Sequence, residues 1–268
     1  MANVALPYHI RAGTGAPALA FVHGFGCSHE DWRAQLVHFA PTRSVVACDL
    51  RGHGATPGRP ADCSIETYGA DVAELLRALD LPNVVLVGHS MGCRVVLQAA
   101  LDAAACVAGV VLVDGSCLGV EGAQRASPAA VEAIAAPDFG DFARQLFEGM
   151  FLPSSDPALR ARIVERGCAL PEAIGAVLFP RMVAWDRQNM ERLLSTLRLP
   201  TLVIQSSYLN TERVRVPLKP GDTSPWLDLV RARIPDARIE VITGVGHFPQ
   251  LEAANAVNRV IGEFVDAL

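Results

Sequence analysis

Residues 83–92 have the sequence Asn-Val-Val-Leu-Val-Gly-His-Ser-Met-Gly, in which a continuously apolar run leads directly into a glycine-flanked serine. Such a run is typical of a central strand that helices cover on both faces. Helical spacing begins at Met91, so the G-x-S-x-G pattern lies between a strand and a helix, the context that its chemistry requires. The two glycines let the strand and the helix approach each other, and the helix N-terminus favours negative charge that develops beside Ser90. This context predicts Ser90 as a nucleophile.

The rest of the chain alternates short β-rich runs with helical patterns, which indicates an α/β protein with a mostly parallel central sheet flanked by helices. Strands are predicted over 4–11, 18–23, 44–49, 83–89, 107–113, 200–205 and 237–242, and helices over 30–40, 65–80, 91–103, 224–234 and 250–267. The alternation stops after Gly115 and resumes near Pro200. We therefore expect residues 1–115 and 200–268 to form a core domain, with residues 116–199 inserted as a helical cap.

Three other segments carry glycine-rich motifs after predicted strands. Residues 23–26 are His-Gly-Phe-Gly, a turn whose main-chain N–H groups are free to point at a ligand. Residues 49–54 are Asp-Leu-Arg-Gly-His-Gly, and residues 244–252 are Gly-Val-Gly-His-Phe-Pro-Gln-Leu-Glu. Together with residues 88–92, these motifs resemble those of the α/β-hydrolase superfamily, and the resemblance spans almost the whole chain outside the cap. In that family the turn at 49–54 has a structural role.

The resemblance implies an α/β-hydrolase fold with a catalytic triad. Ser90 is then the nucleophile, and His247, in the loop after the last strand, is its general base. The backbone N–H groups of Phe25 and Met91 form the oxyanion hole, and His23 braces the oxyanion loop rather than transferring protons. The order of Ser before His suits this superfamily and matches neither chymotrypsin nor subtilisin.

The acid of the triad departs from the family pattern. Its usual position is a G-x-x-D turn after the sixth predicted strand, but residues 205–210 are Gln-Ser-Ser-Tyr-Leu-Asn and include no carboxylate. Asp114, at the end of the preceding strand, matches an alternative position that some α/β-hydrolases use, and we expect it to orient His247. Glu212, in the same enlarged loop, is the second candidate, and Asp222 is a third.

The expected cap is rich in aromatic and methionine side chains. Four of them are predicted to line an apolar substrate pocket: Phe147, Phe151, Met182 and Trp185. For each of the four, the alternative is simple packing of the cap helices onto one another.

The composition excludes several other classes of protein. With 268 residues, 51% of them hydrophobic and 19% charged, the chain is not disordered, and charges interrupt its apolar stretches before they reach the length of a membrane span. A net charge of −5 argues against a nucleic-acid partner. The seven cysteines show no metal-ligand spacing, so neither a metal nor an organic cofactor is expected. The N-terminus shows no export signal, and a cytoplasmic location is the default expectation.

These patterns predict a serine hydrolase that acts on a small molecule through an acyl-enzyme intermediate. A small hydrophobic carboxylic ester or lactone is the expected substrate, because such compounds need the least assistance for the leaving group. Two alternatives stay open: hydrolysis of a carbon–carbon bond in a diketone-like compound, and a catalytically silent member of the fold that only binds a ligand. A serine at the turn excludes dehalogenase and epoxide hydrolase chemistry, which uses an aspartate there. The sequence does not define the oligomeric state.

Overall fold

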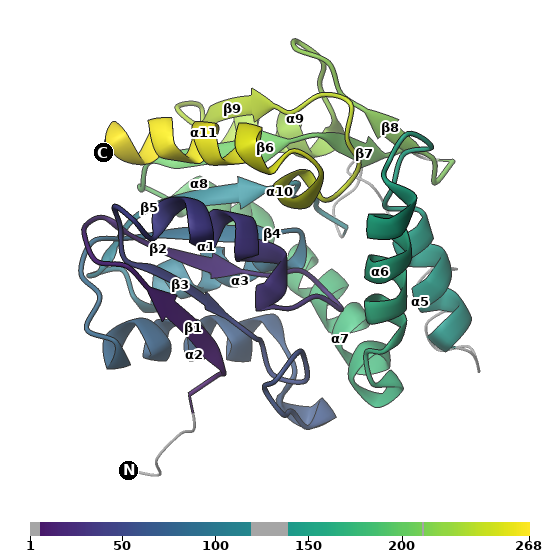
Figure 1. Cartoon of the computed structure of the whole chain (residues 1–268), viewed down its shortest axis with the longest axis horizontal. Helices are drawn as coiled ribbons and strands as arrows, with labels where there is room; N and C mark the ends of the chain where they lie inside the picture. The colour runs from purple at the N-terminus through teal and green to yellow at the C-terminus, as the bar shows by residue number, and fades with distance from the viewer. Residues whose placement is uncertain (1–5, 119–138, 211) are drawn as a thin grey trace.

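A seven-stranded sheet with helices on both faces forms the centre of the molecule (Figure 1). The computed structural model describes residues 6–118, 139–210 and 212–268. The strand order is β1-β3-β2-β4-β5-β6-β9, and the strands are β1 (His9–Ala12), β2 (Ala18–Val22), β3 (Val45–Cys48), β4 (Val84–His89), β5 (Val107–Val113), β6 (Thr201–Gln205) and β9 (Arg238–Val241). β1 runs antiparallel to β3, and every other neighbouring pair is parallel. The fold class predicted from the sequence is confirmed.

The apolar run of β4 is buried on both faces of the sheet, as its sequence predicts. Val84 and Leu86 pack toward one face, and Val85 and Val87 toward the other, because successive side chains of a strand alternate. One face is covered by α2 (Ile65–Ala78), α3 (Met91–Asp102) and α9 (Pro225–Arg233), and the other by α1 (Arg33–Phe39) and α11 (Ala254–Asp266). This double cover fixes β4 and the turn that follows it.

Short side chains set where several of these helices begin. Ser64 precedes α2 and accepts a hydrogen bond from the backbone of Thr67. Ser224 precedes α9 in the same way, with Pro225 at the first helical position. The predicted helix at 250–267 is divided into α10 (Pro249–Glu252) and α11, because Ala253 between them leaves the helical conformation with φ −136°.

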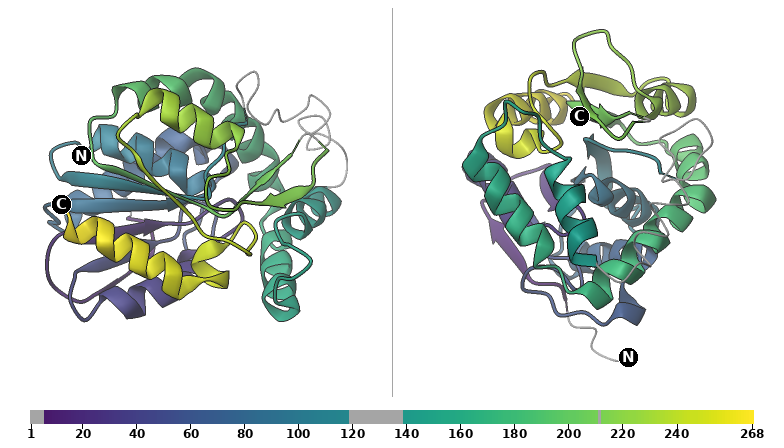
Figure 2. Two further views of the ribbon diagram at one scale, coloured as in Figure 1. Left: turned by 90° about the horizontal axis from the view of Figure 1, so that it is seen from above. Right: turned by 90° about the vertical axis from the view of Figure 1, so that its right-hand side faces the viewer.

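A set of helices follows β5 and precedes β6 in the chain, and the longest of these helices lie beside one end of the sheet (Figures 1 and 2). It comprises α5 (Phe139–Glu148), α6 (Pro157–Cys168), α7 (Glu172–Trp185), the π-helical segment η3 (Asp186–Met190) and α8 (Glu191–Thr196). These helices occupy the part of the chain where the sequence predicts an inserted cap, and they are called the cap below. The first part of that cap, residues 119–138, lies outside the described residues, and the domain boundaries stay predictions.

The region after β6 differs from the expected loop. Residues Ser207–Leu209 and Arg215–Pro217 form β7 and β8, a two-stranded antiparallel hairpin separate from the main sheet. Strands of three residues are too short to show a periodic pattern, so the sequence gives no signal for them. Two 3-10 turns, η1 (His29–Trp32) and η2 (Pro60–Asp62), complete the described elements.

In the described part of the chain, no single helix is long and apolar enough to cross a bilayer. Pro157–Cys168 and Glu172–Thr196 meet the length and composition criteria only when taken together, and they meet at an angle of 96°.

Candidate active site

Ser90 lies on a strained turn between β4 and α3. Its backbone has φ 54° and ψ −114°, a conformation that costs free energy for a residue with a side chain. The glycines on either side are required by close approach: a Cβ at Gly88 would lie 2.3 Å from the carbonyl oxygen of Gly92, and a Cβ at Gly92 would lie 2.4 Å from that of Val22. This is the geometry of a nucleophile turn, which lifts the serine hydroxyl above the edge of the sheet.

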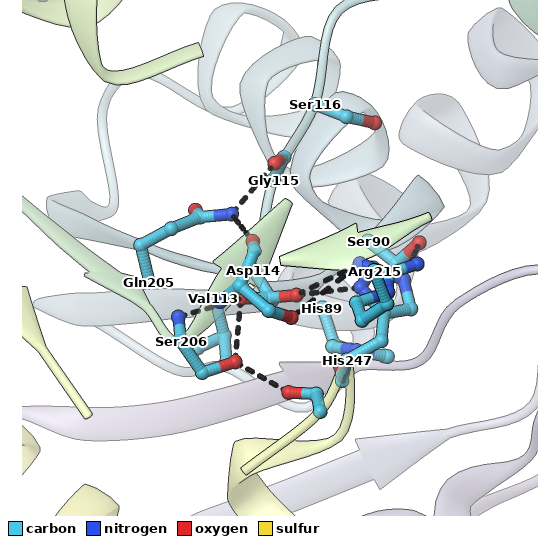
Figure 3. A network of polar contacts seen from close by, with 12 residues as sticks. His89, Ser90, Val113, Asp114, Gly115, Ser116, Gln205, Ser206, Arg215 and His247 are labelled. Carbon is cyan, nitrogen blue, oxygen red and sulfur yellow. Dashed lines mark hydrogen bonds and ion pairs between the residues drawn. The ribbon is translucent and has the colours of Figure 1, made fainter. Parts of the chain in front are cut away.

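His247 joins Ser90 to Asp114 (Figure 3). Its Nε2 lies 2.9 Å from Ser90 Oγ, and its Nδ1 lies 2.6 Å from Asp114 Oδ2. An ionised Asp114 can only accept, so Nδ1 carries the proton and Nε2 is left to accept from the serine hydroxyl. The backbone N–H of His247 donates to Met150 O at 2.8 Å, which holds this loop against the cap. The arrangement suits activation of a serine by a neutral imidazole.

Asp114 is buried at the carboxyl end of β5, where Ser206 satisfies its second oxygen. Asp114 Oδ1 accepts from the backbone N–H of Ser206 at 2.7 Å and from its hydroxyl at 2.8 Å (Figure 3). Burial alone would raise the pKa of Asp114, but the hydrogen bond from His247, nearby positive charge and the Ser206 amide bring this pKa below its ordinary value. Ser206 directly follows β6, close to the usual position of the acid in this family. At that position the chain supplies a hydrogen-bond donor to Asp114 in place of a carboxylate.

The two other candidate acids lie away from this relay. Glu212 is exposed, and its backbone N–H donates to the side chain of Asn210 at 3.0 Å. Asp222 is also exposed and accepts from the backbone of Lys219 at 2.9 Å. Neither carboxylate has a described contact with His247. Among the three candidates, the geometry favours Asp114.

Two histidines in contact have different roles in the site. Burial lowers the pKa of His247, against the hydrogen bond that its Nδ1 donates to Asp114, which raises this pKa. Burial lowers the pKa of His89 further, to about 3, so His89 is neutral near pH 7. His89 Nε2 lies 2.7 Å from the carbonyl oxygen of His247 and therefore carries the proton of this ring. His89 thus fixes the backbone of His247, a contact that the sequence does not predict.

The glycine-rich loop after β2 adjoins the nucleophile turn because β2 and β4 are parallel neighbours, with Val22 paired to Gly88. The backbone N–H groups of Phe25 and Met91 donate to no residue in the described ranges. Met91 is the first residue of α3, a position whose N–H has no partner within a helix. Both groups are therefore available to a ligand, as an oxyanion hole requires.

His23 braces this loop, as the sequence predicts. Its Nε2 accepts from the backbone N–H of Leu50 at 3.0 Å, and its Nδ1 donates to the carbonyl oxygen of Gly24 at 2.8 Å. Burial holds the pKa of His23 well below its ordinary value, so both contacts are made by a neutral ring. The turn at 49–54 and the oxyanion loop are thereby tied together.

All four predicted pocket residues are buried in the apolar cluster that includes the cap. Phe147 abuts the oxyanion loop: a Cβ at Gly26 would lie 2.6 Å from its ring. Phe151 stacks on Phe248, the residue after the catalytic histidine candidate, with ring centroids 5.3 Å apart. Met182 and Trp185 belong to the same cluster without a described contact to the relay. For these last two residues, packing within the cap accounts for their position.

Two further cap phenylalanines approach the oxyanion loop, although the sequence does not single them out from the other aromatic residues. The ring of Phe25 contacts that of Phe179 edge-on at 5.7 Å, and Phe179 contacts Phe142 in the same way at 5.4 Å. An apolar wall therefore runs from the oxyanion loop into the cap.

A buried ion pair connects α3, the helix after Ser90, to η3 in the cap. Arg94 donates to both carboxylate oxygens of Asp186, at 2.7 and 2.6 Å, and its Nη1 donates to the carbonyl oxygen of Ser90 at 3.3 Å. The side chains of Arg94 and Asp186 are 1% and 0% exposed. The only sequence signal for this contact is a charged residue within the otherwise apolar start of the helix after Ser90.

Cysteines near the site do not provide a second nucleophile. Burial raises the pKa of Cys93 to about 12 and that of Cys27 further. Both are therefore protonated near pH 7 and unreactive. In the part of the chain that the structure describes, no group of three or more His, Cys, Asp or Glu side chains could hold a metal ion.

Comparison with known proteins identifies relatives of this chain. Its residues 19–260 match the Alpha/beta hydrolase family. An uncharacterized protein of Mycobacterium tuberculosis is 27% identical over 278 aligned positions, which cover 95% of this chain and 76% of the relative.

Solved structures share the fold over nearly the whole chain. A structure described as an N-acyl homoserine lactone degrading enzyme superposes with a TM-score of 0.79 and 26% identity, covering 96% of each chain. A thermophilic esterase from Thermogutta terrifontis also superposes with a TM-score of 0.79, at 25% identity, covering 97% of this chain and 93% of the esterase. With its parallel sheet, its cap and its match over most of the sequence, this chain belongs to the alpha/beta hydrolase family and is a hydrolase.

Proposed function

We propose that this hydrolase cleaves a small hydrophobic carboxylic ester or lactone through an acyl-enzyme intermediate on Ser90. The observation that carries the proposal is the continuous relay in which His247 contacts Ser90 Oγ at 2.9 Å and Asp114 Oδ2 at 2.6 Å. The strained backbone of Ser90 supports it, because such strain is retained where the surrounding structure fixes a functional geometry.

In the proposed reaction, Ser90 Oγ attacks the acyl carbon while its proton passes to His247 Nε2. Asp114 stabilises the imidazolium, and the N–H groups of Phe25 and Met91 bind the oxyanion. His247 then donates its proton to the leaving oxygen, which departs as an alcohol or, in a lactone, stays attached as a ring-opened hydroxyl. A water molecule then loses a proton to His247 and attacks the acyl-enzyme. The bond between the acyl carbon and Ser90 Oγ breaks, the carboxylic acid leaves, and His247 returns the proton to Ser90 Oγ.

The substrate class follows from the surroundings of Ser90 and from the relatives. Phe25, Phe147 and Phe179 present an apolar environment at the oxyanion loop, which favours a hydrophobic acyl or alcohol group. The similar solved structures include one described as an esterase and one described as a lactone-degrading enzyme. Both substrate types use the same attack on an acyl carbon.

The test is a substrate panel with matched variants. We expect wild-type protein to hydrolyse p-nitrophenyl esters of increasing acyl length, or simple lactones, with kcat/KM falling as the acyl group becomes long or charged. Ser90→Ala should abolish this turnover, while Ser195→Ala, which changes an exposed serine in α8, should retain it. Turnover retained in Ser90→Ala would overturn the proposal. A β-diketone in the same panel tests the carbon–carbon alternative, and its preferential cleavage would contradict ester or lactone hydrolysis.

A further inference from the structure

β8 brings a largely buried guanidinium close to the proposed triad acid. Arg215 Nη1 lies 4.0 Å from Asp114 Oδ2, and the two side chains are 11% and 0% exposed (Figure 3). Arg215 is held in place by its Nε, which donates to the carbonyl oxygen of Gly149 at 3.2 Å, and by a longer contact of 3.5 Å from Nη1 to Ser207 Oγ. At 4.0 Å the guanidinium acts on Asp114 through its charge rather than through a hydrogen bond.

The hairpin that carries Arg215 occupies the part of the chain where the family's usual acid would follow β6. In this hairpin Leu209 pairs with Arg215 and Ser207 pairs with Pro217, which fixes the position of the guanidinium. The acid comes from β5 instead, as Asp114. The enlarged loop therefore places a cation beside an acid that another strand supplies.

Several charged and titratable groups face His247 from the elements packed around it. Asp114 comes from the end of β5, His89 from β4, Arg94 from α3 and Arg215 from β8. Glu252, in α10, accepts from the backbone N–H of Gly246, the residue before His247. Of these groups, Asp114 favours a protonated His247, while Arg215 and Arg94 oppose it. The charge of Arg94 is balanced by its ion pair with Asp186. Arg215, in contrast, has Asp114, the proposed triad acid, as an ion-pair partner.

We propose that Arg215 is a positioning residue that keeps Asp114 ionised and facing His247, and that its charge extends the working range of the His247 base to lower pH. This inference rests on the proposed function, because it assumes that His247 activates Ser90. Arg215 itself touches neither Ser90 nor, in the proposed reaction, the acyl group.

The test measures how pH affects the labelling of Ser90 by a fluorophosphonate, a readout that needs no knowledge of the substrate. Two neutral variants, Arg215→Gln and Arg215→Met, remove the charge, and Arg215→Lys restores it. Arg213→Met removes an exposed arginine from the same hairpin and is the matched control. Circular dichroism and thermal unfolding establish which variants are folded.

We expect the acidic limb of the labelling profile to move upward by about 0.5 to 1 pH unit in the neutral variants, because loss of a nearby cation raises the pKa of His247. Arg215→Lys should return the limb most of the way, and Arg213→Met should leave it in place. A lower labelling rate with an unmoved limb would overturn the inference, as would a limb that moves downward. Failure of both neutral variants to fold would make Arg215 a purely structural residue and would overturn it too.

The same experiment separates this inference from the proposed function. If wild-type protein is not labelled at Ser90 at any pH, the proposed function fails. If the wild type is labelled with a sigmoidal profile that the neutral variants share, only the role of Arg215 is refuted.

Glu252, whose pKa is raised by burial, is the other acid near this loop, so Glu252→Gln is included to show that the limb belongs to His247. A limb abolished by Glu252→Gln would count against the inference.

Discussion

At the scale of single residues, the candidate relay depends on the carboxylate of Asp114, which is buried and has hydrogen-bond partners for both of its oxygens. Asp114 is 1% exposed, and a buried charge is tolerated only when partners replace the lost water. The backbone N–H of Ser206 donates to one oxygen, the Ser206 hydroxyl shares its proton between that oxygen and the carbonyl oxygen of Gly246, and His247 donates to the other oxygen. This division of contacts leaves Oδ2 available to set which nitrogen of His247 carries the proton.

Replacement of Asp114 by asparagine should lower kcat by about 10⁴-fold, the effect that the same change has in a serine protease triad. An amide can present its N–H toward Nδ1 and stabilise the wrong tautomer of His247. The measurement is steady-state hydrolysis of the best ester in the panel, with folding checked by thermal unfolding. Glu212→Gln is the control and should cost less than about tenfold, because Glu212 is exposed. The opposite ranking would move the acid role to Glu212.

The pH profile of the wild type gives a second prediction for single residues. The free enzyme is active when His247 is neutral, so kcat/KM should rise with pH through the pKa of His247. From the sequence alone this rise would be centred near the ordinary value of about 6.5. Burial lowers the pKa of His247 in the structure, so we expect the midpoint below 6.5. A midpoint above 6.5, or a rate that does not fall at any acidic pH at which the protein stays folded, would contradict this assignment.

At the scale of elements, α3 and η3 are joined by the buried pair of Arg94 and Asp186. Asp186→Ala should reduce the free energy of unfolding by about 3 to 5 kcal/mol, because it leaves the guanidinium of Arg94 buried without its charge partner. Urea unfolding measures the change. Glu191→Ala is the matched control: it breaks an ion pair with Arg233 in which both side chains are about 40% exposed, and it should cost less than about 1 kcal/mol. Equal costs for the two variants would contradict the buried pairing.

The elements differ in how well the sequence predicts them. β4 and β5 are predicted within a residue because their continuous apolar runs follow from burial on both faces of the sheet. The sequence predicts a loop in place of the hairpin of β7 and β8. Each of these strands has three residues, too few to show a periodic pattern, and the two strands pair only with each other. The π-helical turn of η3 is likewise unpredicted, since it interrupts a continuous helical pattern without proline or glycine.

At the scale of the whole molecule, the candidate site is assembled from residues far apart in the chain. Ser90, Asp114 and His247 follow β4, β5 and β9, and the parallel sheet brings the carboxyl ends of these strands to one edge. The motifs around Ser90 and His247 predict both residues, because each needs a local pattern of glycines. The sequence favours Asp114 over Glu212 but leaves both open, since the contact between Asp114 and His247 depends on the order of the strands in the sheet. Arg215 could not be predicted, because its place depends on the hairpin.

The cap is attached to the core through the loop that carries His247. Met150 O accepts from the backbone of His247 at 2.8 Å, and Ser155 Oγ donates to Glu252 at 2.5 Å. Figure 2 shows the cap helices beside one end of the sheet. The candidate base is therefore held between the two parts of the chain.

The central claim is that His247 makes Ser90 nucleophilic, and covalent labelling tests it most directly. Wild-type protein is treated with a fluorophosphonate and digested, and the modified peptide is identified by mass spectrometry. We predict a single phosphonyl group on Ser90, at a rate that His247→Ala reduces by orders of magnitude while Ser195→Ala leaves it unchanged. Absence of label on folded wild-type protein, or label on Ser90 that forms equally fast in His247→Ala, would contradict the account.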